Sequence, residues 1–119
     1  MTTRQDRISH LLTEAVSEII QRELKDPRLG FITVTDAEIT ADLRHAKVFV
    51  SVMGSEEQRA ESMGVLRRAE HFVRQVLGKR WTMKVLPEIK FELDTSVDHG
   101  IRILELLEQI KQDEERGPS

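Results

Sequence analysis

The sequence predicts an α+β fold in a single domain, and three observations support this prediction. Residues 3–24 carry apolar side chains at helical spacing, residues 31–53 alternate between apolar and polar side chains, and residues 56–93 show both patterns in turn. At 119 residues the chain is long enough to bury one core without disulfides. The predicted order is helix, strand, strand, long or broken helix, strand, helix.

The first predicted helix begins at a capping signal. Thr3 and Asp6 have the spacing at which a hydroxyl and a carboxylate each accept a backbone amide proton at a helix start. The helix is expected to end at Asp26–Pro27, because the residue before proline is disfavoured in the α conformation. It is expected to belong to the core through a stripe made of Ile8, Leu11, Leu12, Ala15, Val16, Ile19, Ile20 and Leu24.

Two strands are predicted next, paired as a hairpin. Within residues 31–39 the apolar side chains change from even to odd positions, which predicts a β-bulge near Thr35 and Asp36. A turn over residues 40–45 follows. Residues 46–53 then have apolar side chains at every even position and are rich in valine, as is typical of a half-buried strand.

The middle of the chain predicts a helix over Glu56–Leu77 and a strand over Met83–Leu93. Ser55 is the expected N-cap, and Gly64 and the Ala69–His71 step are the weak points of the helix. The stripe of this helix consists of Leu66, Ala69, Phe72, Val73, Val76 and Leu77. A last helix is predicted from about Val97, with Ile101, Leu104 and Leu107 facing inward, and residues 111–119 are expected to be a polar, disordered tail.

Charge is unevenly distributed along the chain. The whole chain has a net charge of −3, yet residues 59–90 carry eight basic and three acidic side chains, a net charge of +5. The local potential, and not the total charge, acts on a phosphate within a Debye length of about 8–10 Å. This pattern favours a basic face that binds nucleic acid, and the alternative is that the lysines and arginines only solvate an exposed helix.

The composition argues against several classes of function. There is no cysteine and no apolar run of membrane-spanning length, and the N-terminus is polar, so a cytoplasmic location is expected. The four histidines lie in four separate parts of the chain, and neither a phosphate-binding nor a nucleophile motif occurs. We therefore expect no catalytic residues, no metal site, no cofactor and no small-molecule substrate.

The few aromatic residues do not predict a base-stacking platform. Phe72 and Phe91 fall on the apolar side of their elements and are expected in the core, so exposed aromatics on adjacent strands are missing. Trp81 lies in the basic turn between Arg80 and Lys84. It either stacks on a base or covers the edge of the core, as large aromatic residues more often do.

Three stretches of the sequence resemble the ribosome-binding factor A family, which has a type II KH-like fold. These are Glu23–Arg28 with Thr33–Thr35, Asp42–Val52, and Leu66–Gly78 with Leu86–Ser96. KH domains bind single-stranded RNA through a Gly-x-x-Gly loop between two helices, which this chain lacks. The family instead has an Ala-x-Gly kink, which aligns with Ala69, Glu70 and His71, so that histidine replaces the glycine.

The resemblance implies a fold and a function. Residues 1–110 would form one KH-like RNA-binding domain, a three-stranded sheet with helices packed on one face. The protein would be a non-enzymatic assembly factor that binds the immature 30S subunit and assists late maturation and 5′-end processing of 16S ribosomal RNA. It would act as a monomer, alongside other assembly factors, and would be linked to growth in the cold. No membrane is implied as a partner.

The basic residues of the middle region are the candidate RNA contacts. Backbone-directed binding with little base readout is predicted for Arg44, Arg67, Arg68, Arg74, Lys79, Arg80, Lys84 and Lys90. Two alternatives remain at this point. One is a protein-interaction adaptor with a charged helix and no specific RNA target, and the other is a small hydrolase or nuclease.

Overall fold

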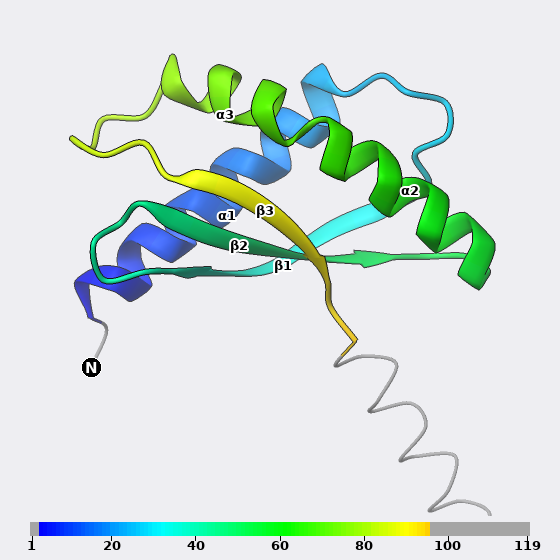
Figure 1. Ribbon diagram of the computed structural model, residues 1–119, viewed down its shortest axis with the longest axis horizontal. Coiled ribbons are helices and arrows are strands. Elements are labelled where there is room, and N and C mark those ends of the chain that lie inside the picture. The colour runs from blue at the N-terminus through cyan, green and yellow to red at the C-terminus, as the bar shows by residue number, and fades with distance from the viewer. Residues whose placement is uncertain (1–2, 96–119) are drawn as a thin grey trace, which may run out of the picture.

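The computed structural model describes residues 3–95, which form three helices and a three-stranded sheet (Figure 1). The helices are α1 (Arg4–Glu23), α2 (Glu56–Arg68) and α3 (Glu70–Gly78), and the strands are β1 (Ile32–Ile39), β2 (His45–Val52) and β3 (Glu88–Leu93). Their order and type are those predicted from the sequence. The predicted last helix and the polar tail lie outside the described residues.

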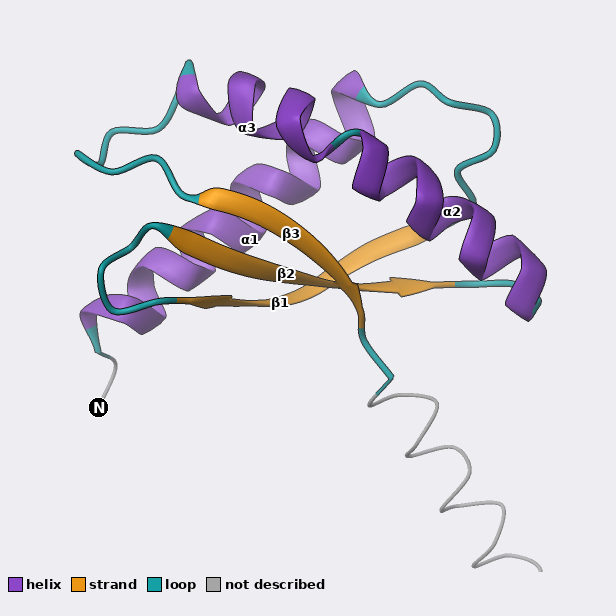
Figure 2. Ribbon diagram, in the orientation of Figure 1, coloured by secondary structure: helices purple, strands orange, loops and turns teal. Residues whose placement is uncertain are grey.

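The sheet is mixed, with β2 in the centre (Figure 2). β1 pairs with β2 in antiparallel orientation, which confirms the hairpin, and the register shifts between Val34 and Asp36, which confirms the bulge. β3 pairs with β2 in parallel orientation, so that the chain must cross over between them, and α2 and α3 supply this crossover. The strand order was not predictable from the sequence.

All described helices lie on one face of the sheet (Figure 2). The Thr3 hydroxyl and the Asp6 carboxylate form the predicted capping box at the start of α1. Five of the predicted stripe residues of α1 are buried, but Leu11 is 46% exposed, so that its assignment to the core was wrong. Leu11 lies at the margin of the stripe, since the buried positions are Ile8, Leu12, Val16, Ile19 and Ile20.

The third strand is shorter than predicted, because residues 83–87 form a loop. Pro87 has no amide proton to donate to a neighbouring strand. The carbonyls of Leu86 and Pro87 accept hydrogen bonds from the Arg74 side chain, and the Val85 carbonyl accepts one from the Trp81 indole at 2.9 Å. Trp81 packs half-buried against the core, in agreement with the structural role considered for it.

The long middle helix is broken at Ala69, which ends α2 and precedes α3. Ala69 has φ −92° and ψ 0°, and its amide donates to the carbonyls of Val65 and Leu66. The break therefore forms without a glycine at position 71, whereas α2 runs uninterrupted through Gly64. The helical phase restarts at Glu70 and buries Val73 and Leu77, but leaves Phe72 42% exposed. The prediction that Phe72 belongs to the core was wrong, while Phe91 is fully buried as predicted.

A glycine fixes the connection from β2 to α2. Gly54 has φ +128°, which favours glycine, and a Cβ atom there would lie 2.5 Å from Oε1 of Gln58. That oxygen accepts the Ser55 amide proton in the capping box of α2. Gly54→Ala is expected to lower the free energy of unfolding by about 1–3 kcal/mol, measured by urea denaturation.

Gly30→Ala is the matched control for this substitution. A Cβ atom at Gly30 would meet its nearest neighbours at 3.6 and 3.7 Å, which is ordinary contact. Its effect should be clearly smaller. Equal effects of the two substitutions would contradict a special backbone requirement at Gly54.

Candidate nucleic-acid interface

Three of the predicted RNA contacts meet at one end of the sheet. Arg44 at the end of the β1–β2 turn, Arg74 on α3 and Lys84 in the loop before β3 line a hollow of about 400 Å³. We call these three residues the cation triad. Val85 and Leu86 line the same hollow, together with His45 and Glu88, whose side chains lie 3.6 Å apart. Segments far apart in the sequence thus concentrate positive charge at one place.

Arg74 is held rigidly within the triad. Its Nε donates to the Pro87 carbonyl at 3.1 Å and its Nη2 donates to the Leu86 carbonyl at 3.0 Å. The side chain is half-buried, so its position is fixed by packing as well as by these bonds. A guanidinium has five donors, and two neutral acceptors leave its positive charge uncompensated. Arg74 therefore has a structural role and still contributes charge to the hollow.

The position of Arg44 follows from the turn that precedes it. The Asp42 carboxylate accepts the Thr40 hydroxyl at 2.6 Å and the Arg44 amide at 3.1 Å. The hydrogen bond from Thr40 and, to a smaller extent, that from the Arg44 amide lower the pKa of Asp42 below its ordinary value. The Arg44 carbonyl accepts the Glu88 amide at 2.8 Å and so connects the turn to the start of β3. The exposed Arg44 side chain is thereby placed beside the loop that carries Lys84.

The remaining helix-borne cations are dispersed. Arg67 and Arg68 are exposed at the end of α2. Arg28 lowers the pKa of Asp26 to about 2 through hydrogen bonds from its side chain and amide, and the charge of Arg68 adds a smaller effect. Arg68 therefore lies near the loop that connects α1 to β1.

After α3, Lys79 is exposed and Arg80 forms an ion pair with Glu18 of α1. The hydrogen bond from Arg80 is the main cause that lowers the pKa of Glu18. Because this carboxylate offsets the charge of Arg80, Arg80 is a weaker candidate for binding phosphate than Lys79.

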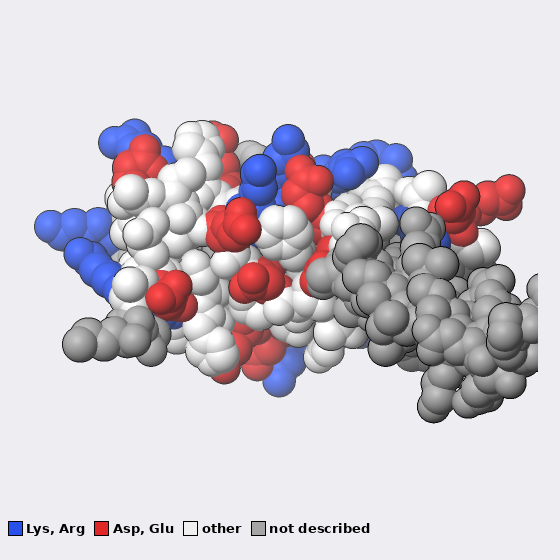
Figure 3. Space-filling view, turned by 90° about the horizontal axis from the view of Figure 1, so that it is seen from below, with Lys and Arg blue, Asp and Glu red and all other residues white. Residues whose placement is uncertain are grey.

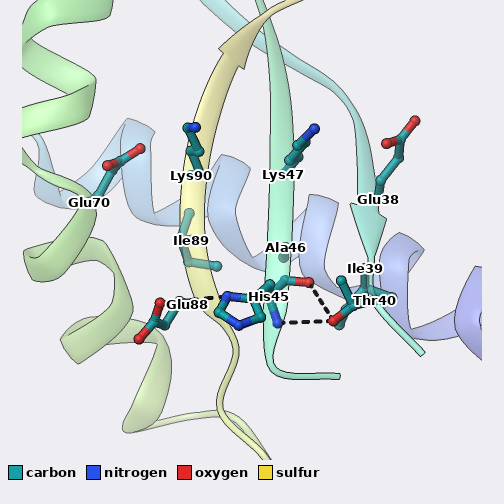
Figure 4. Close-up of a pocket in the computed structure, with 10 residues that line it drawn as sticks. All are labelled: Glu38, Ile39, Thr40, His45, Ala46, Lys47, Glu70, Glu88, Ile89 and Lys90. Carbon is teal, nitrogen blue, oxygen red and sulfur yellow. Dashed lines mark hydrogen bonds and ion pairs between the residues drawn. The ribbon is translucent and has the colours of Figure 1, made fainter. Parts of the chain in front are cut away.

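Lys90 lies apart from the other candidates, on the face of the sheet that no described helix covers. Glu38, Lys47 and Lys90 form a row across the three strands there (Figure 4). Lys90 Nζ lies 3.7 Å from the Glu92 carboxylate. A hollow of about 530 Å³ is lined by this row together with His45, Glu70 and Glu88, so acidic and basic side chains are mixed in it. Acidic side chains also lie across the middle of this face, whereas lysines and arginines gather at one end and along one edge (Figure 3).

Glu70 was not among the residues that sequence reasoning selected for a specific contact. It is the first residue of α3, and its Oε2 accepts the amide proton of Phe91 at 2.7 Å. Phe91 belongs to β3, at the edge of the sheet, and its amide points away from β2. The helix break thus positions a carboxylate that accepts an amide proton at the edge of β3. No sequence signal reveals this contact.

Glu70→Ala is expected to lower the free energy of unfolding by about 1–3 kcal/mol, since a partly buried amide loses a charged acceptor. Glu38→Ala removes an exposed carboxylate from the same sheet and should change the stability by less than about 0.5 kcal/mol. Urea denaturation of both variants measures the difference. If the two values coincide, the Glu70–Phe91 bond contributes nothing to stability.

Neither a metal-binding cluster nor a membrane-spanning helix occurs in the described part of the chain. No group of three or more histidine, aspartate or glutamate side chains within residues 3–95 is arranged to hold a metal ion. None of α1, α2 and α3 is long and apolar enough to cross a membrane.

The fold and the cation groups define a KH-like α+β domain that has a helix break in place of a Gly-x-x-Gly loop. The model of the family described as "Ribosome-binding factor A" matches residues 4–107. A ribosome-binding factor A from Halothermothrix orenii is 51% identical over 112 residues, covering 94% of this chain and 92% of that protein. One from Desulfitobacterium hafniense is 47% identical over 95% of this chain and 90% of its own length. The chain belongs to the ribosome-binding factor A family.

Solved structures agree with this assignment. The crystal structure of ribosome-binding factor A from Thermus thermophilus has a TM-score of 0.67 at 30% identity and covers 76% of this chain and 97% of its own. The solution structure of a putative ribosome-binding factor A from Thermotoga maritima has a TM-score of 0.69 at 34% identity, with coverages of 77% and 88%. A Thermus thermophilus homology model, fitted into a cryo-EM map of a 30S–RbfA complex, has a TM-score of 0.61 at 31% identity, with coverages of 73% and 91%.

Proposed function

We propose that this protein binds the 30S ribosomal subunit and acts, without catalysis, in the maturation of its 16S ribosomal RNA, including processing at the 5′ end. The observation that carries the proposal is the relative fitted into a map of a 30S–RbfA complex, which is 31% identical and covers 73% of this chain. Family membership over residues 4–107 supports the same partner. A factor with this partner works in the cytoplasm, and we propose that it binds as a monomer.

The geometry supports a mode of binding that rests on the RNA backbone. Phosphates are recognised by lysine and arginine through charge, and arginine can hold a phosphate with two parallel hydrogen bonds. The cation triad is the strongest candidate, because three cations from separate segments share one hollow and one of them is fixed. Arg67 and Arg68 at the end of α2 and Lys79 after α3 are exposed and are proposed as further, separate contacts. Arg80 and Lys90 each have an acidic partner and contribute less.

Little base readout is expected from this surface. Trp81, the aromatic residue of the basic turn, is half-buried and uses its indole N–H for the Val85 carbonyl. Sequence-specific RNA recognition depends on splayed bases that stack on accessible aromatic side chains. The surface around the triad instead offers charge, so specificity for the subunit would come from the shape of the folded RNA.

Co-sedimentation with purified immature and mature 30S subunits across a salt series tests the proposal. The wild type should be retained on the immature particle, with weaker retention as salt rises, because binding releases counterions from the RNA. Arg67→Ala/Arg68→Ala/Lys79→Ala should reduce retention. Arg22→Ala/Lys25→Ala removes two exposed charges from α1 and the segment after it, and should not.

The other outcomes distinguish the alternatives. Equal retention of all variants would keep the ribosomal partner and place the binding surface elsewhere. No retention of the wild type on either particle at any salt concentration would favour a protein-interaction adaptor. Turnover of an RNA substrate by the purified protein would contradict the non-catalytic role.

A further inference from the structure

The uncovered face of the sheet has two unlike halves. The half near the β1–β2 turn is charged and carries Glu38, His45, Lys47, Glu88 and Lys90. The other half, which we call the neutral half, consists of Phe31, Thr33, Phe49, Ser51 and Met53. The Asp94 carboxylate lies beside these residues and accepts the Thr35 hydroxyl. Asp36 and Glu92 pair with Phe49 from the two outer strands and mark the boundary.

The neutral half presents large apolar side chains to solvent. Phe31 is 83% exposed and Met53 is 73% exposed, the highest values among the large hydrophobic residues of the described chain. The Met53 amide donates to the Phe31 carbonyl at 3.1 Å, so the two residues continue the hairpin ladder as neighbours. Single exposed apolar residues are ordinary, but an adjacent pair that extends toward Phe49 indicates a surface with an occupant.

The chain leaves the sheet beside this half. β3 ends at Leu93 opposite Val50, and the Asp94 amide donates to the Val50 carbonyl at 2.7 Å. The Thr35 hydroxyl donates to Oδ2 of Asp94 at 2.6 Å. This bond crosses β2, because β2 lies between β1 and β3. It crosses on the uncovered face, because the buried side chains of Val48 and Val50 fill the face that packs against the helices. The chain is thereby directed onto the uncovered face at the level of the neutral half.

The segment that follows has the pattern needed to cover that surface. Residues 97–110 carry apolar side chains at helical spacing, among them Ile101, Leu104 and Leu107, while Arg102, Glu105 and Gln109 lie on the opposite side of a helical projection. Leu106 falls on the side of Arg102, and Glu108 falls at the flank of the apolar stripe. Fourteen residues of helix are about 21 Å long, and three strands span about 10 Å, so the segment reaches across the sheet. An amphipathic helix of this kind requires an apolar surface for its stripe.

We propose that residues 97–110 dock as a helix on the neutral half, with Ile101, Leu104 and Leu107 against Phe31, Phe49 and Met53. The docked segment covers the sheet on the face opposite α1, α2 and α3. This arrangement differs from the expectation that all helices share one face. It leaves the cation triad accessible, because the triad lies at the other end of the sheet. The proposal does not depend on the ribosomal partner.

Amide spectra of the uniformly ¹⁵N-labelled full chain test the docking. Leu104→Asp should shift the resonances of residues 31–33 and 49–53, while those of Glu38 and Lys47 stay in place. Gln109→Asp adds the same charge on the polar side of the segment and is the matched control, for which no such shifts are expected. The proposal would be overturned if the resonances of the neutral half did not shift, or if they shifted equally in both variants.

Cysteine pairs identify the occupant, since the natural chain has no cysteine. Met53→Cys is combined in turn with Ile101→Cys, Leu104→Cys and Leu107→Cys, and the same three are combined with Lys47→Cys as controls. Disulfides require Cβ atoms about 3.5–4.5 Å apart, so at least one Met53 pair should oxidise within a monomer several times faster than its control. Equal rates in the two sets would show an undocked segment, and disulfides between chains would show a second copy as the occupant. Either result overturns the proposal.

Discussion

Replacing Arg44 and Lys84 together with alanine is expected to weaken binding to the immature 30S subunit about 10- to 100-fold near 0.1 M salt. Both side chains are exposed and line the hollow of the cation triad. Removing one phosphate-binding side chain should reduce the slope of log affinity against log salt by about 1, so the slope of the double variant should be smaller by about 2. The fold should be unaffected, because surface substitutions of this kind change stability little.

The salt slope separates direct contacts from indirect effects. Binding is measured by titration of fluorescently labelled protein with subunits at four or more salt concentrations. Arg22→Ala/Lys25→Ala, with the same change of charge away from the triad, should keep the wild-type slope. If both double variants lose affinity equally, total charge and not the triad governs binding.

Replacing Arg74 with alanine is expected to lower the free energy of unfolding by about 2–4 kcal/mol, the largest stability effect predicted for this protein. The Leu86 and Pro87 carbonyls would lose a charged donor, and the loop between α3 and β3 would lose its attachment to the helix. Arg74→Lys keeps the charge but lacks the fork that spans two acceptors, so an intermediate loss is expected. Chemical denaturation of the three proteins gives the comparison.

Arg67→Ala is the matched control for Arg74, because it removes an exposed arginine from the preceding helix. It should change stability by less than about 0.5 kcal/mol while still reducing retention on the subunit. The two arginines, equivalent in the sequence pattern, would then differ in role. A small stability change at Arg74 would show that its hydrogen bonds to the loop are replaceable.

Much of the secondary structure follows from local rules that the sequence displays directly. The capping boxes at Thr3 and Ser55, the parity change at the β1 bulge and the alternation in β2 each depend on residues a few positions apart. The sequence also carries the resemblance that the family match confirms over residues 4–107. The sequence did not indicate that residues 83–87 form a loop. The side chains that donate hydrogen bonds to the carbonyls of this loop, Arg74 and Trp81, belong to α3 and to the turn after it.

Which basic residues act together was decided only in three dimensions. Arg44 and Lys84 are 40 positions apart, and a parallel β2–β3 pair with a helical crossover brings them to one hollow. The same packing pairs Arg80 with Glu18, whereas Lys90 and Glu92 are neighbours on one face of the same strand. Sequence alone determined the elements, the charge and the family, since these are properties of neighbouring residues. Tertiary structure decided which charges are held by partners and which face a ligand, because electrostatic interaction depends on distance in space and on burial.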